Sequence, residues 1–364
     1  MSERNVISAD SHVIEPPEMW REYIDPKLRD RAPHLEHGKE NDFYCIEGLK
    51  PMDVTVLSSA GTPSEELKTW RRWDAPGRLK GGWDPVQRKK DAIKDGVDAE
   101  VLYATIAMKM LPLKDMEYKH ACFKAYNRWL ADFCNTDTKR FMGMAVLMTD
   151  DIESAVKDMH EAKKMGLGGA MLGMTSSDEV TYASPEFDPL WAVAQDLDMP
   201  LAMHNFSQGE TRVVRSRFET FATAPADVQY CISSLIFNDV FERFPKLKIL
   251  SVENDVGWAA NYLQRLDHCF HRYSVLLNKT FKSGRLPSQQ FRDHVWLTFM
   301  DDMAAVRTYD LVGVDNVMWA NDYPHGDSTF PHSREAISRQ FDHIPATDRQ
   351  KLLRDNVLKL FKWH

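Results

Sequence analysis

The residues that could do chemistry stand where short apolar stretches end. Asp10 and His12 lie two positions apart in VISADSHVIEP, directly after an apolar run. In a β-strand, residues i and i+2 point to the same face, so both side chains would point past the end of that strand. Both are common metal ligands, and neither suits a buried apolar surface without a compensating partner. The pair by itself fits either a metal site or a strand-ending turn in which Asp10 caps a loop.

Three further apolar stretches end in a polar residue of the same kind. PLAMH ends at His204, LKILSVE ends at Glu253, and VMWAND ends at Asp322. If these stretches are parallel strands of one barrel, their final side chains converge at its mouth. Two imidazoles and several carboxylates in one dry pocket would repel one another unless a cation were present. The joint placement therefore indicates a divalent metal.

The elements that would position these residues alternate along the chain. Eight strand candidates, most of them followed by a helical pattern, lie at 6–12, 99–105, 141–151, 168–174, 200–206, 247–255, 295–303 and 316–325. This alternation predicts parallel strands with right-handed crossovers, and eight such units predict a (β/α)8 TIM barrel, as one domain over residues 1–364. A doubly wound open sheet is the alternative, but no glycine fingerprint for a dinucleotide follows any strand candidate.

Residues from about 33 to 85 interrupt the alternation. They contain FYCIEGLKPMDVTVLSS, which we expect to form a hairpin, and KTWRRWDAPGRLKGGWDP, which is rich in glycine, proline and tryptophan. We predict an inserted hairpin and loop subdomain after the first strand, either packed on itself or serving as a lid or a subunit contact. We expect the chain to form a homo- or hetero-oligomer.

Composition and charge indicate a globular protein without a nucleic-acid or membrane partner. Hydrophobic residues make up 43% of the chain and charged residues 27%, and 46 Lys and Arg against 54 Asp and Glu give a net charge of −8. The N-terminal sequence lacks the basic and apolar segments of a signal peptide. No apolar run approaches the roughly 20 residues of a membrane span. Five scattered cysteines without CxxC spacing fit reduced thiols. We therefore expect a cytoplasmic protein.

The strand-end residues belong to four longer motifs. These are SADSHVIEPPEMW, PLAMHNF, FPKLKILSVENDVGWAANYLQRLDH and VMWANDYPHGDSTFPHS. Together they resemble the amidohydrolase-related (amidohydrolase 2) family of the amidohydrolase superfamily, the group that contains aminocarboxymuconate-semialdehyde decarboxylase and the resorcylate-type decarboxylases. The resemblance implies a metal-bearing (β/α)8 barrel. In it, Asp10 and His12 match the pair of strand 1, His204 matches the histidine of strand 5, and Asp322 matches the aspartate of strand 8.

Glu253 departs from that resemblance, since many relatives have a histidine at the end of strand 6. A neutral imidazole can move protons near pH 7, whereas a glutamate does so only if its pKa is raised. A glutamate can, however, bind or bridge metals through both oxygens. We therefore predict one or two divalent ions, either zinc or manganese or iron. The predicted ligands are Asp10, His12, His204, Glu253 and Asp322.

We predict a metal-dependent enzyme that hydrolyses or non-oxidatively decarboxylates a small, carboxylate-bearing organic substrate. In hydrolysis, Asp322 would take the proton of a metal-activated water. In decarboxylation, the metal would hold the substrate carboxylate while an acid protonates carbon. Glu253 and His325 are the other catalytic candidates. Arg212 and Arg215 could recognise an acidic substrate, or they could be solvated surface side chains.

Two other functions remain open from the sequence. A carboxylate-rich site with two histidines could hold iron or manganese, as one ion or two, for oxygen activation. Alternatively, the chain could be a metal-bearing, non-catalytic subunit of a hetero-oligomer.

Overall fold

The computed structural model describes residues 5–55, 57–67, 71–75, 77–174, 181–205, 207 and 217–364. Within them, eight parallel strands form one sheet in the order β1-β5-β6-β7-β8-β9-β10-β11. The strands are β1 (Ile7–His12), β5 (Ala99–Tyr103), β6 (Phe141–Val146), β7 (Gly169–Leu172), β8 (Leu201–His204), β9 (Ile249–Val252), β10 (Val295–Phe299) and β11 (Val317–Trp319). Each predicted strand stretch contains one of them.

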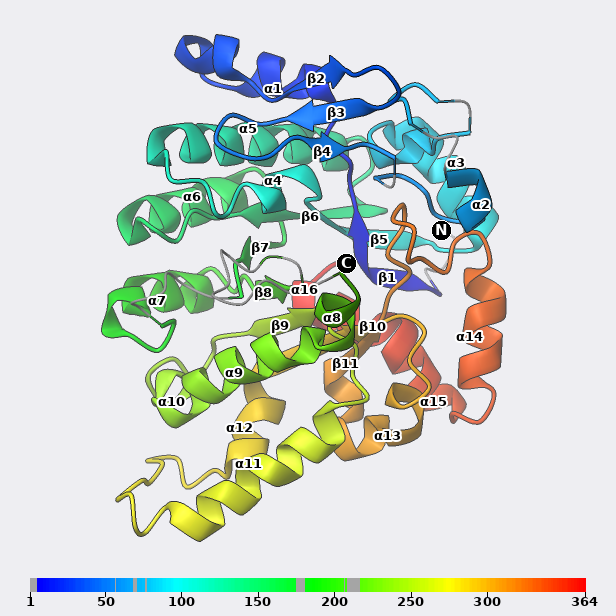
Figure 1. The fold of residues 1–364 in the computed structure, drawn as a ribbon. Coiled ribbons are helices and arrows are strands. Elements are labelled where there is room, and N and C mark those ends of the chain that lie inside the picture. The colour runs from blue at the N-terminus through cyan, green and yellow to red at the C-terminus, as the bar shows by residue number, and fades with distance from the viewer. Residues whose placement is uncertain are drawn as a thin grey trace.

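The first and last strands of this sheet meet and nearly close it into a barrel. The backbone N–H of His12 donates to the carbonyl of Tyr323 at 2.7 Å, and the N–H of Asp322 donates to the carbonyl of Asp10 at 3.0 Å. Helices surround most of the sheet (Figure 1). The prediction of a (β/α)8 barrel is confirmed, and the carboxyl ends of β1 and β11 are held side by side.

The helix α3 (Pro85–Asp95) begins and ends at residues that the sequence marks as helix ends. Asp84 caps α3 by accepting from the N–H groups of Val86 and Gln87, and Gly96 ends that helix in a left-handed conformation at φ 80°. The described helices are α1 (Pro17–Tyr23), α2 (Ser64–Leu67), α3 (Pro85–Asp95), α4 (Ile106–Lys109), α5 (Met116–Asn135), α6 (Ile152–Lys164), α7 (Asp188–Asp196), α8 (Arg217–Ala222), α9 (Ala224–Phe237), α10 (Val240–Arg243), α11 (Ala259–Tyr273), α12 (Pro287–His294), α13 (Ala305–Val312), α14 (Ser333–Phe341), α15 (Ala346–Gln350) and α16 (Asn356–Phe361). None of these helices has the length and apolar character that crossing a membrane requires.

A small antiparallel sheet lies outside the barrel, between β1 and β5 in the sequence. Its order is β2-β3-β4, from β2 (His34–His37), β3 (Asp42–Cys45) and β4 (Met52–Asp53). In Figure 1 it lies beside α1, among the blue elements. Tyr44 of β3 is fully buried, and its hydroxyl donates to the carbonyl of Glu15 at 2.9 Å. This contact ties the small sheet to the segment that leaves β1.

Candidate metal centre

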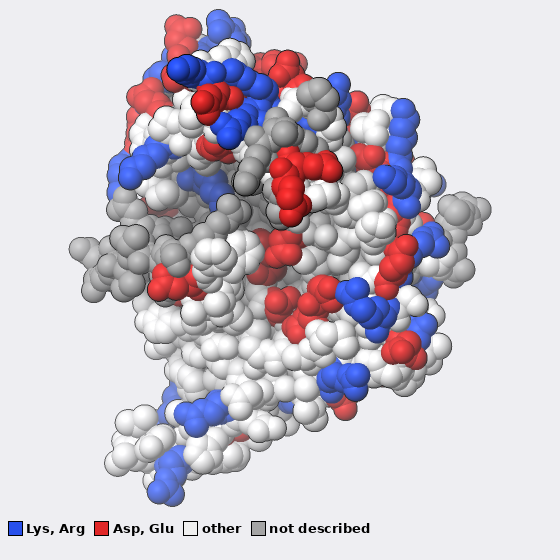
Figure 2. All heavy atoms as spheres, turned by 45° about the vertical axis from the view of Figure 1, so that its right-hand side comes forward, with Lys and Arg blue, Asp and Glu red and all other residues white. Residues whose placement is uncertain are grey.

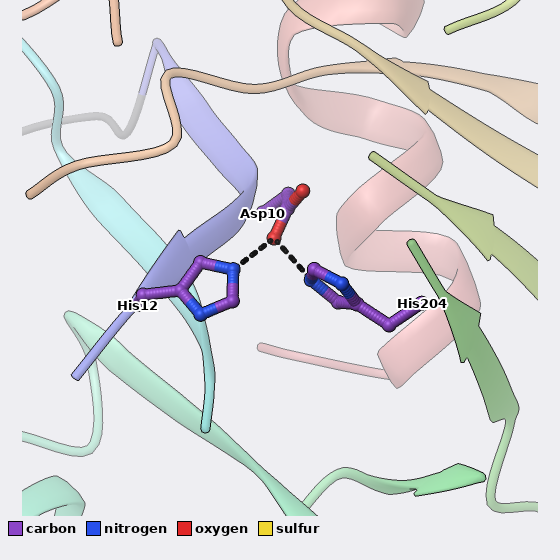
Figure 3. A group of neighbouring side chains, drawn as sticks. All are labelled: Asp10, His12 and His204. Carbon is purple, nitrogen blue, oxygen red and sulfur yellow. Dashed lines mark hydrogen bonds and ion pairs between the residues drawn. The ribbon is translucent and has the colours of Figure 1, made fainter. Parts of the chain in front are cut away.

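Three buried side chains converge at the carboxyl ends of β1 and β8 (Figure 3). Oδ1 of Asp10 lies 3.6 Å from Nε2 of His12 and 3.4 Å from Nε2 of His204. All three residues are at most 2% exposed. One ligand atom from each lies within 4.8 Å of the other two, which is the geometry that a single ion requires. The alternation of side chains along β1 and the parallel pairing of the barrel bring them together.

A second group shares His12 and adds two residues that follow β11. Oδ1 of Asp322 lies 3.5 Å from Nε2 of His12, and Oδ2 accepts from Nδ1–H of His325 at 3.2 Å. The rings of His12 and His325 are 4.1 Å apart between centroids. Ligand atoms of His12, Asp322 and His325 also lie within 4.8 Å of one another. The two groups therefore form one cluster around His12.

Within the described residues, the hydrogen bonds of the cluster leave two buried polar atoms without a hydrogen-bond partner. Nδ1–H of His12 donates to the carbonyl of Ala104 at 3.0 Å, which directs the lone pair of Nε2 into the cluster. This Nε2 and Oδ1 of Asp322 make no hydrogen bond among the described residues. Because buried polar atoms without a hydrogen-bond partner are rare, the two atoms indicate that a positively charged group binds between them. A divalent cation with nitrogen and oxygen ligands fits that position.

Glu253 lies beside the cluster rather than among its converging atoms. Its Oε2 is 3.3 Å from Nδ1 of His204, the ring nitrogen that faces away from Asp10. The backbone of Glu253 is left-handed at φ 57°, and its N–H donates to Oγ1 of Thr298 at 3.1 Å. The two groups of potential ligands contain the other predicted site residues, namely Asp10, His12, His204, Asp322 and His325. The two predicted substrate-binding arginines, Arg212 and Arg215, lie outside the described residues.

Burial and like charge make the cluster electrostatically crowded. Burial, and after it a neighbouring carboxylate, raises the pKa of Glu253 and of Asp322 well above the ordinary values. Burial, reinforced by neighbouring cationic groups, lowers the pKa of His12 well below its usual range and that of His325 to about 3. The neutral, protonated form of these carboxyl groups and the neutral, deprotonated form of these imidazoles are thus favoured. A bound cation would relieve the repulsion among the carboxylates.

A cavity of about 190 Å³ opens onto Asp10, Glu253 and Asp322. Its wall also carries Asp301, which ends the predicted strand stretch 295–303, the carboxylates of Asp255 and Asp327, and Phe221 of α8. Burial, and after it the charge of Asp302, raises the pKa of Asp255 to about 6. Acidic side chains gather near the middle of the face drawn in Figure 2. The site is therefore acidic beyond its own candidate ligands.

Two residues that sequence reasoning did not select hold the cluster in place. The hydroxyl of Thr105 lies 3.0 Å from Nε2 of His325 and 3.4 Å from Nδ1 of His12. Arg88 of α3 is fully buried, and its guanidinium donates to the carbonyl of His12 at 2.6 Å. Thr105 follows a strand, so the rule that found His204 could have found it. Nothing in the local pattern around Arg88 marks it as buried.

The chain is similar to known protein sequences over most of its length. Residues 96–363 match the amidohydrolase family. The chain is 22% identical to 2-amino-3-carboxymuconate-6-semialdehyde decarboxylase of Dictyostelium discoideum, over 76% of each chain. It is 23% identical to γ-resorcylate decarboxylase of a Polaromonas species, over 88% of this chain and 99% of that protein.

Solved structures show the same fold. The match to an amidohydrolase from Mycobacterium avium subsp. paratuberculosis has a TM-score of 0.78 at 18% identity, covering 99% of this chain and 98% of the other. The match to 5-carboxyvanillate decarboxylase of Novosphingobium aromaticivorans, complexed with manganese and a nitrobenzoic acid, has a TM-score of 0.71 at 18% identity, covering 98% and 96%. These similarities confirm the prediction of an enzyme. They lend no support to the oxygenase alternative.

Proposed function

Because the chain belongs to the amidohydrolase family, as its motifs predicted, we propose that it is a metal-dependent, non-oxidative decarboxylase of a small unsaturated or aromatic carboxylic acid. One observation carries the proposal: a buried cluster borders a cavity, and one imidazole nitrogen and one carboxylate oxygen of this cluster make no hydrogen bond within the described part of the chain. The cavity of about 190 Å³ is of the right size for one ring, since a cavity of ~150 Å³ in another protein binds benzene.

Four of the clustered residues would hold the cation. Nε2 of each histidine and one oxygen of each carboxylate are the candidate ligand atoms, from Asp10, His12, His204 and Asp322. Two imidazoles and two carboxylates suit manganese, iron or zinc. Manganese is the ion bound in the 5-carboxyvanillate decarboxylase structure. When bound, the cation would supply the positive charge that fixes the substrate carboxylate and an adjacent oxygen.

The chain's own residues would manage the proton. When the bond between the carboxylate and its carbon breaks, the electron pair stays on that carbon and carbon dioxide leaves, so the carbon must then take one proton. Glu253 is the candidate donor, because its carboxyl group lies on the cavity wall and outside the converging ligand atoms. The imidazole of His325, held between Asp322 and Thr105, is positioned to keep Asp322 oriented.

The test is an anaerobic assay of the metal-loaded protein with a panel of hydroxy- and amino-substituted benzoates and muconates, reading released carbon dioxide. We expect metal-dependent release from at least one member. Glu253→Gln should retain the metal and lose turnover by about 10²-fold or more. Glu335→Gln is the matched control, because it removes the same charge from a side chain that is 72% exposed.

Each other outcome rejects the proposal in a distinct way. Release of an acid from amide or ester substrates, without carbon dioxide, would assign hydrolysis. Turnover that appears only when oxygen is admitted to the assay would assign the oxidative alternative. Full turnover by Glu253→Gln would remove Glu253 as the proton donor.

A further inference from the structure

The antiparallel sheet outside the barrel carries another group of potential metal ligands. His34 and Glu36 of β2 are two positions apart, so both side chains lie on one face of the sheet. Cys45 of β3 stands directly opposite His34 in the antiparallel pairing. One ligand atom from each of the three lies within 4.8 Å of the other two. A nitrogen, an oxygen and a sulfur donor therefore share one small surface.

The opposite face of the same two strands fixes this arrangement. Leu35 pairs with Tyr44, and Tyr44 is fully buried against the segment that leaves β1. Because successive residues of a strand alternate between faces, the burial of Tyr44 turns its neighbour Cys45 to the other side. The side chains of His34 and Glu36 are 60% and 65% exposed, whereas Cys45 is 8% exposed. The group is thus open to dissolved ions, with the sulfur at its base.

The imidazole of His34 is oriented as a ligand would be. Its Nδ1–H donates to the carbonyl of Ala32 at 3.1 Å, so the lone pair is on Nε2. That Nε2 lies 3.6 Å from Oε1 of Glu36, too far for a hydrogen bond. Histidines that bind metals characteristically donate their other N–H to a carbonyl or a carboxylate in this way.

We propose that His34, Glu36 and Cys45 form a second metal site, which binds a zinc-type divalent cation with water as the fourth ligand. Thiolate, imidazole and carboxylate are the donors that zinc accepts in tetrahedral sites. The thiolate separates this site from the nitrogen and oxygen cluster of the barrel, which suits harder ions. On binding, the cation replaces the thiol proton, and that proton passes to the solvent. The bound ion would tie β2 to β3.

The experiment titrates the manganese-loaded protein with Co²⁺ and reads sulfur-to-cobalt charge-transfer absorption in the near ultraviolet. Only a thiolate ligand produces this absorption, and the described barrel cluster contains no cysteine. We expect the signal to saturate at one ion per chain and to be displaced by Zn²⁺. Cys45→Ser should abolish it. Cys269→Ser, which removes the exposed cysteine of α11, should leave it unchanged.

Absence of the signal in the wild-type protein, or its persistence in Cys45→Ser, would overturn the proposal. Loss of the signal in Cys269→Ser would assign the signal to Cys269 and would equally overturn the proposal. If circular dichroism shows that Cys45→Ser does not fold, variants of the two exposed ligands, His34 and Glu36, test the site instead. His34→Gln and Glu36→Gln should each weaken Co²⁺ binding at least about tenfold. Unchanged affinity in both would refute the site.

Discussion

Replacing Arg88 by glutamine should destabilise this protein more than removing an equivalent arginine at its surface. The buried guanidinium forms a two-pronged ion pair with Glu100, with nitrogen–oxygen distances of 2.9 and 2.8 Å. It also donates to the carbonyls of His12 at 2.6 Å and of Gly81 at 3.2 Å. Both side chains of the ion pair are at most 2% exposed. The substitution therefore leaves a buried carboxylate without its partner.

The expected size of the effect follows from that burial. Removing one member of a buried ion pair costs about 3–5 kcal/mol. With an unfolding entropy of about 2.1 cal/mol/K per residue, a chain of 364 residues has about 0.76 kcal/mol/K. The melting temperature of Arg88→Gln should therefore fall by about 4–7 °C. The affinity for the active-site metal should fall as well, because the carbonyl of His12 loses its donor.

The assay is calorimetry of the metal-free proteins at one scan rate, with a surface ion pair as the control. Arg285 makes the same two-pronged contact with Asp293, but both side chains are 43% exposed. Arg285→Gln should cost less than about 1 kcal/mol, or about 1 °C. Adding Glu100→Gln to Arg88→Gln should restore part of the loss, because no unpaired charge remains. The reasoning would be refuted if the melting temperature of Arg88→Gln fell by less than about 2 °C. It would also be refuted if the double variant lost as much stability as the two single variants together.

Three further predictions concern the barrel cluster and a buried histidine. Asp322→Asn should keep the fold and lose turnover, which the decarboxylation assay checks. It should also raise the melting temperature of the metal-free protein near pH 8, as calorimetry would show, because burial raises the pKa of this carboxyl and so penalises its charged form. His204→Ala should lose the bound metal while remaining folded, as elemental analysis and circular dichroism would show, and full metal occupancy would remove it from the ligand set. Burial lowers the pKa of His294, whose Nδ1–H donates to the carbonyl of Leu247 at 2.8 Å. The folded state therefore prefers the neutral ring. The contribution of this ring to folding stability is present above pH ~6.5 and is lost as the pH falls through the lowered pKa. His294→Asn should flatten the fall in melting temperature between pH 6.5 and 5, and an unchanged slope would contradict the assignment.

The sequence predicted the barrel and most of the cluster because both follow from local patterns. Apolar strands followed by helices predict parallel pairing, and parallel pairing places the ends of β1, β8 and β11 at one edge. Asp10, His12 and His204 were found by that rule alone, and their ring and carboxylate atoms do converge. The rule needs no knowledge of the loops, since the strands themselves aim these side chains.

The same rule does not show where a side chain lies when backbone direction or long-range pairing decides its position. The left-handed backbone of Glu253 follows β9 directly, and its carboxylate meets the far nitrogen of His204 instead of the convergence point. No strand pattern predicts a positive φ in a residue other than glycine. Arg88 was missed for a different reason, because a charged residue on a helix is ordinarily exposed. Its burial depends on Glu100, which only the folded barrel places opposite it.

The position of the cluster at the closing point of the sheet links its chemistry to the integrity of the barrel. Asp10 and His12 belong to the first strand and Asp322 follows the last, and two backbone hydrogen bonds join these segments. Arg88 contacts the carbonyls on both sides, those of His12 and Tyr323. A cation held by Asp10, His12 and Asp322 would thus bridge the end of β1 and the segment that follows β11, whose backbone carbonyls Arg88 also contacts. Metal binding and barrel closure would then stabilise each other, because each holds the same pair of strand ends together.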